Sequence, residues 1–106
     1  MVGDLKTTSI KYLKIQILSF IEMGFPGWVL CAFQDVSGNT HTFEEKVPVV
    51  SSDFLDENSD YPQDGLIGCE ILEEHENVIT IDLMNPRQIQ TQNGENVFKV
   101  FSNQIG

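Results

Sequence analysis

The sequence predicts an all-β fold: a small antiparallel barrel or sandwich of five to six strands with one long acidic loop. Apolar runs rich in Ile, Val and Phe, several with strand-like alternation, recur along the chain. Gly, Pro and Asn separate these runs, and no segment has a clear helical pattern. The 106 residues, 41% of them hydrophobic, suffice for one core, so residues 1–106 are expected to form a single domain.

The first strand is predicted over residues 10–23. In KYLKIQIL, polar and apolar residues alternate, and the alternation slips by one residue in the following segment. Such a slip indicates a β-bulge near Leu18 and Ser19. A helix is the competing interpretation, because the apolar residues of this segment also approximate a 3.6-residue period. The content of Ile, Tyr and Phe favours the strand.

The next segments predict a turn and a hairpin. FPGW at residues 25–28 is a turn signal, and the apolar run WVLCAFQDV follows it. Gly and Asn between Asp35 and Thr40 indicate a hairpin connection to THTFEEKVPVV. Pro48 lacks a backbone donor, so the second strand is expected at a sheet edge or to end there.

A second hairpin is predicted from LIGCEILEE, the connection HEN, and VITIDLM. Its expected inward residues are Ile71, Ile79 and Ile81, and its expected outward residues are Glu70, Glu73, Glu74 and Asp82. Asn85 and Pro86 should end this strand. RQIQTQNGEN is then a polar connection with an Asn93-Gly94 turn, and VFKVF is the last strand.

The charge is strongly acidic and unevenly distributed. The net charge is -10, and nine of the 16 acidic residues lie between Asp53 and Glu76, with no Lys or Arg in that interval. The stretch SSDFLDENSDYPQDG begins this region, and Ser52 could cap a short helical turn over residues 52–55. A negative field repels phosphate backbones and anionic lipids and attracts basic surfaces.

The acidic stretch does not match a calcium-binding loop of the EF-hand type. A loop that starts at Asp56 would place Tyr61 where Gly is needed and Ile67 where a bidentate Glu is needed. The spacing of Cys31, His41, Cys69 and His75 likewise matches no zinc motif. We therefore expect no metal ion and no cofactor, with both cysteines as reduced core thiols.

Catalysis and nucleic-acid binding are the weaker alternatives. Cys, His and carboxylate residues could serve a small metal-dependent or Cys/His hydrolase, but no catalytic signature arranges them, so no catalytic residue is assigned. A small barrel can also bind single-stranded nucleic acid on a basic face with aromatic residues, which here would be Phe43, Tyr61, Phe98 and Phe101. The basic face is missing, so we expect neither activity.

No apolar run approaches the roughly 20 residues of a membrane span, and the N-terminal residues lack the order of a secretory signal. The sequence therefore predicts a cytoplasmic protein without a membrane partner.

A protein-binding role is the leading hypothesis. In size and charge the chain resembles the immunity proteins that neutralise basic toxins, a resemblance that no particular residue carries. It implies an inhibitor of a basic toxin or nuclease. Acidic side chains would steer the partner and embedded apolar ones would hold it. The predicted binding residues are Asp53, Phe54, Leu55, Asp56, Glu57, Asp60, Tyr61, Asp64, Glu73, Glu74 and Glu76.

Overall fold

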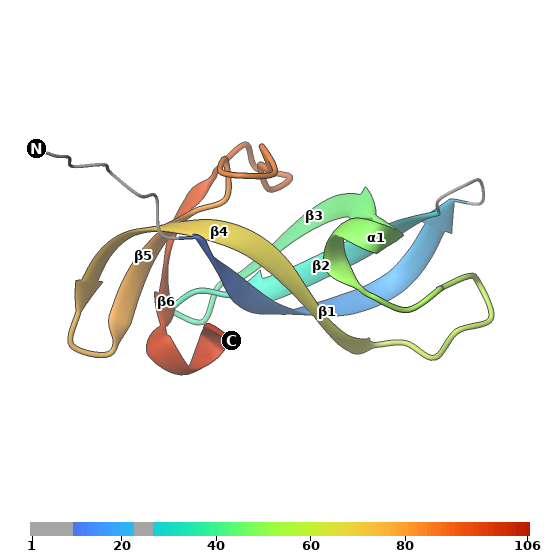
Figure 1. Cartoon of the computed structure of the whole chain (residues 1–106), viewed down its shortest axis with the longest axis horizontal. Coiled ribbons are helices and arrows are strands. Elements are labelled where there is room, and N and C mark those ends of the chain that lie inside the picture. The colour runs from blue at the N-terminus through green and yellow to red at the C-terminus, as the bar shows by residue number, and fades with distance from the viewer. Residues whose placement is uncertain (1–9, 23–26) are drawn as a thin grey trace, which may run out of the picture.

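The computed structural model describes residues 10–22 and 27–106. These residues form six strands, one short α-helix and one 3-10 turn (Figure 1). The elements are β1 (Ile10–Glu22), β2 (Trp28–Gln34), β3 (Thr40–Lys46), α1 (Val47–Val50), β4 (Gln63–His75), β5 (Val78–Asp82), β6 (Val97–Phe101) and η1 (Ser102–Gln104).

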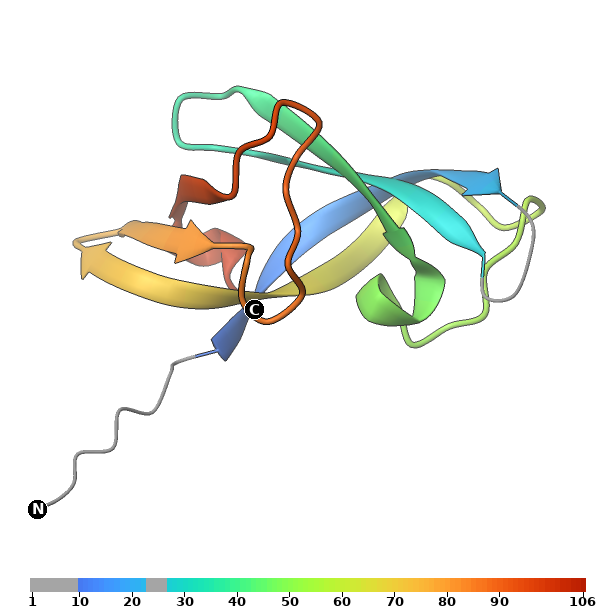
Figure 2. The ribbon, with the colours of Figure 1, turned by 90° about the horizontal axis from the view of Figure 1, so that it is seen from above.

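The six strands form one antiparallel sheet in the order β3-β2-β1-β4-β5-β6. The sheet curls into a half-barrel (Figures 1 and 2). The two long strands, β1 and β4, lie at its centre and join the two hairpins, β2–β3 and β5–β6. The prediction of a small antiparallel β fold is thus confirmed.

Strand β1 settles the ambiguity over residues 10–23, because residues 10–22 are a strand and not a helix. Its register on β2 shifts between Ile17 and Ser19, which confirms the predicted bulge, and shifts again between Phe20 and Glu22. Extra residues increase local twist. The bulges therefore help β1 to curl between its neighbours β2 and β4.

The core lies on the inner face of the curled sheet. It contains Leu13, Ile17, Ile67 and Ile81, none of which exposes any surface. Both cysteines belong to it as free thiols. The predicted inward residues Ile79 and Ile81 are buried, and Ile71 is partly buried and packs against the core.

The β4–β5 hairpin departs from simple alternation. Its register shifts between Ile71 and Glu73, so that Glu73 pairs with Thr80 and Glu74 pairs with Ile79. Cross-strand partners share a face of the sheet. Glu74 is therefore on the face of Ile79, but it is exposed, close to the turn of the hairpin.

The β2–β3 hairpin forms where the sequence predicts it. The carboxylate of Asp35 accepts hydrogen bonds from the backbone N–H groups of Ser37 (2.9 Å) and Asn39 (3.0 Å). Gly38 has φ of 83°, a conformation that glycine adopts without strain. Residues 25 and 26 of the predicted FPGW turn lie outside the described residues, and only Gly27 and Trp28 of it are described.

Two details after β3 differ from expectation. Strand β3 ends at Lys46, because residues 47–50 turn into α1 with Pro48 in its first turn, where the missing N–H needs no partner. The helical turn expected over residues 52–55 is absent there. Ser51, and not Ser52, holds the backbone at this point, since its hydroxyl accepts a hydrogen bond from the N–H of Asp53 (3.0 Å).

The half-barrel closes through single hydrogen bonds and not through a continuous ladder. The N–H of Val36, next to the β2–β3 turn, donates to the carbonyl of Lys99 in β6 (2.9 Å). Residues 83–96 cross toward β3 (Figure 2), where the N–H of Gln92 donates to the carbonyl of Thr42 (3.0 Å). Leu83, Ile89 and Thr91 hold this connection in the core. None of the helices in the described residues is long and apolar enough to cross a membrane.

Candidate partner-binding surface

The acidic loop, residues 51–62 between α1 and β4, is held from within. Leu55 is only 5% exposed and packs in the core. The hydroxyl of Tyr61 donates to the carbonyl of Asp56 (2.7 Å), and the N–H of Asp56 donates to the hydroxyl of Ser59 (3.0 Å). Burial, with the nearby charges of Asp56 and Glu57, raises the pKa of Tyr61, so the hydroxyl remains a donor. These contacts fix the loop backbone.

Phe54 is the apolar residue that the acidic loop presents to solvent. Its side chain is 79% exposed, whereas Leu55 is buried and Tyr61 is half-buried. Near Phe54 in the sequence, the side chains of Asp53, Glu57 and Asp60 are exposed and that of Asp56 is partly exposed. Of the three apolar residues predicted to contact a partner, Leu55 is buried, Tyr61 is half-buried and supports the loop, and Phe54 is the most exposed.

Strand β4 separates the acidic residues that are close in sequence. The acidic loop precedes β4, and Glu73, Glu74 and Glu76 lie at its far end, in and beside the hairpin with β5 (Figure 1). A strand of 13 residues spans about 40 Å at roughly 3.3 Å per residue. The predicted binding residues therefore form two groups at opposite ends of β4. Asp64 stays with the first group, and its carboxylate accepts a hydrogen bond from Gln16 (2.6 Å).

The cysteines and histidines do not converge on a reactive site. Burial raises the pKa of Cys31 to about 12 and that of Cys69 to about 11, so both thiols are protonated at neutral pH and are weak nucleophiles. No group of three or more His, Cys, Asp or Glu side chains within residues 10–22 and 27–106 is arranged to hold a metal ion.

His41 has a defined place that the sequence did not reveal. Its Nε2 lies 2.8 Å from a carboxylate oxygen of Asp35, and its Nδ1 lies 3.9 Å from Glu95. Its ring packs against Phe33 and Phe98, with centroids 5.5 Å and 4.5 Å away. The hydrogen bond from His41 lowers the pKa of Asp35, and the backbone donors of Asn39 and Ser37 add to this effect. The contacts join β3 to the hairpin turn and to the connection before β6.

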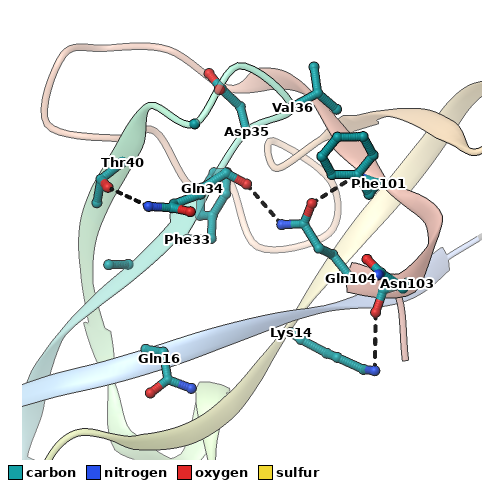
Figure 3. Close-up of a pocket in the computed structure, with 12 residues that line it drawn as sticks. Lys14, Gln16, Phe33, Gln34, Asp35, Val36, Thr40, Phe101, Asn103 and Gln104 are labelled. Atoms are coloured by element: carbon teal, nitrogen blue, oxygen red, sulfur yellow. Dashed lines mark hydrogen bonds between the residues drawn. The ribbon is translucent and has the colours of Figure 1, made fainter.

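Two of the four aromatic residues considered for nucleic-acid binding belong to the core. Phe43 and Phe98 are 1% and 6% exposed. Tyr61 braces the acidic loop, and Phe101, at 40% exposed, lines a cleft of about 590 Å³ between β1, the end of β2 and the C-terminal turn (Figure 3). These side chains do not form one aromatic face.

Polar side chains in the cleft bond to backbone carbonyls and to one another. Lys14 donates to the carbonyl of Asn103 (3.2 Å), and the amide of Gln104 donates to the carbonyl of Gln34 (2.8 Å) (Figure 3). Gln34 in turn lies 3.4 Å from the hydroxyl of Thr40. We read the cleft as part of the closure of the half-barrel, because its polar groups bond across it.

No protein-family model matches the chain, and neither the curated proteins nor the solved structures gave a match.

Proposed function

We propose that the protein is a non-enzymatic binding module that captures a basic partner protein through its acidic loop. The further proposal is that the partner is a basic toxin or nuclease, which the protein inhibits in the cytoplasm as an immunity protein would. The observation that carries the proposal is the side chain of Phe54, 79% exposed on a braced loop among carboxylates.

The two kinds of side chain would contribute differently to binding. Carboxylates at the surface accelerate the encounter with a basic partner and fix its orientation, and the net charge of -10 adds to the attraction. Burial of an aromatic side chain in a partner's pocket supplies much of the affinity. Leu55 and Tyr61 already fix the loop, so little ordering entropy would be lost on binding.

The first prediction concerns Phe54. Phe54→Ala should weaken binding to the partner captured from the native source by about 2 kcal/mol, roughly 30-fold, because a buried aromatic anchor is lost. Leu72→Ala is the matched control, since Leu72 is also exposed (49%) but lies near the other end of β4. Isothermal titration calorimetry at several salt concentrations measures both effects. Salt-independent binding, or equal losses in the two variants, would contradict the proposal.

A further inference from the structure

Among the strands that the structure describes, none covers one edge of β4 over residues 63–69. It pairs with β1 along residues 63–70, but β5 begins to pair with it only at Glu70. Residues 63–69 therefore have a strand neighbour on one side only. The other open edges of the sheet are partly covered: Gln92 bonds to Thr42 in β3, and Val36 bonds to Lys99 in β6.

The direction of the backbone groups on this edge follows from the pairing. The N–H of Gly106 donates to the carbonyl of Tyr12 (2.8 Å), and Ile105 bridges Leu13 on the side of β1 opposite β4. The groups of Tyr12 therefore point away from β4. Because backbone direction alternates along antiparallel strands, the groups of its partner Gly68, and of Leu66 and Asp64, point away from β1.

Glu70 has the same parity as Gly68, so its backbone groups also point away from β1, toward β5. For Asp64 and Leu66 there is no backbone hydrogen-bond partner on this side within the described part of the chain. A strand with such unpaired groups is a template for another strand.

A groove runs along this part of β4. Two adjoining hollows, of about 610 Å³ and about 280 Å³, share Leu66 and residues 50–52 in their walls. Tyr12 (52% exposed) and Leu66 (44% exposed) provide apolar surface, whereas Asp53 and Asp64 lie in the larger hollow. Among the described residues, Lys14 is the only cation that lines either hollow, and its ammonium group donates to the carbonyl of Asn103 in the C-terminal turn.

We propose that an extended, basic segment of the partner protein adds to β4 as an extra strand in this groove. The backbone groups of Asp64 and Leu66 would pair with the segment. Alternate side chains of the segment would then meet Tyr12 and Leu66, and a Lys or Arg would meet Asp53 and Asp64. This inference rests on the proposed function and specifies how the partner is held beside the acidic loop.

The test uses random dodecapeptides displayed on phage and selected against the full chain. Selected peptides should be rich in Lys or Arg alternating with apolar residues. Leu66→Pro removes the outward-pointing N–H without breaking a bond to β1, and proline is tolerated at such an edge position. It should weaken the selected peptides about 10-fold or more, whereas Leu72→Lys, on the same strand away from the groove, should leave their binding unchanged.

Hydrogen exchange read by NMR provides the second measurement and needs no variant. Bound peptide should protect the amides of Asp64 and Leu66 selectively, because those of Gly65 and Ile67 already bond to β1. If Leu66→Pro does not fold, as judged by circular dichroism, Leu66→Lys replaces it, since a cation there repels a basic segment.

Three outcomes would overturn the inference. They are a selection without enriched peptides, enriched peptides that leave the two amides unprotected, and a concentration-dependent dimer that buries this edge against a second copy. In each of these cases, binding of the captured partner is measured as well. If that binding still depends on Phe54 and on salt concentration, the proposed function stands and only strand addition is ruled out.

Discussion

At the scale of single residues, the clearest device is the pair formed by Asp35 and His41. One carboxylate oxygen of Asp35 accepts two backbone hydrogen bonds in the hairpin turn, and the other contacts the ring of His41. The ring also packs between Phe33 and Phe98, which come from different strands. In the sequence Asp35 looks like a surface turn residue. Through its contact with His41, it links the hairpin turn to the core.

The pH dependence of stability tests this link. The pKa of Asp35 is lowered in the folded state, so its contribution is fully present above the unfolded pKa of about 4 and is lost as pH falls through the folded value. Asp35→Asn should therefore lower stability at neutral pH and flatten the acid limb of the profile. Urea unfolding of both proteins at pH values from about 2 to about 7 measures how the free energy of unfolding depends on pH.

Glu45→Gln is the control, because its expected effect on stability at neutral pH is opposite in sign to that of Asp35→Asn. Burial raises the pKa of Glu45, so ionisation of this residue reduces stability as pH rises through its unfolded value. Its removal should stabilise the protein at neutral pH. If the acid limbs of the wild type and Asp35→Asn coincide, the His41 contact does not stabilise the ionised carboxylate.

At the scale of elements, the side chain of Gln104 connects β2 and β6, between which there is no ladder of backbone hydrogen bonds. Its oxygen accepts from the N–H of Phe101 in β6 (2.7 Å), and its nitrogen donates to the carbonyl of Gln34 in β2 (2.8 Å). One amide therefore bridges two strands that do not pair directly (Figure 3). The bridge helps to keep the half-barrel curled.

Gln104→Ala should lower the free energy of unfolding by about 1–3 kcal/mol, because two hydrogen bonds are lost. Asn103→Ala is the matched control, since only its backbone carbonyl makes a bond in this turn, and it should change stability by less than about 0.5 kcal/mol. Gln104→Glu keeps the acceptor for Phe101 and loses the donor to Gln34. Its free energy of unfolding should therefore lie between those of the wild type and Gln104→Ala, or below both. Urea denaturation measures all three, and equal stabilities of the two alanine variants would contradict the bridge.

The strands were predictable because alternation and turn residues are local signals. The bulge near Leu18 could be read from a slip in that alternation, and it is present between Ile17 and Ser19. The helical turn α1 was missed because VPVV also suits a strand, and only its packing on the core decides the matter. The roles of Gln104 and His41 depend on partners up to 70 residues away, which no local pattern reveals.

At the scale of the whole molecule, the fold divides one acidic segment into two surfaces. The sequence suggests one continuous patch from Asp53 to Glu76, but β4 carries its ends apart (Figure 1). Both ends carry several carboxylates, so charge alone does not distinguish them. The acidic loop differs in its exposed Phe54 and in the open edge of β4 beside it.

The most direct test of the account compares two triple variants that remove equal charge from the two ends. One is Asp56→Asn, Glu57→Gln and Asp60→Asn in the acidic loop, and the other is Glu73→Gln, Glu74→Gln and Glu76→Gln at the hairpin. Stopped-flow or surface plasmon resonance measurements with the captured partner give the rates. We predict that the loop variant lowers affinity about 10-fold or more while the hairpin variant lowers it less than about threefold. Equal losses would show that only net charge attracts the partner, and would contradict the assignment of the acidic loop as its binding surface.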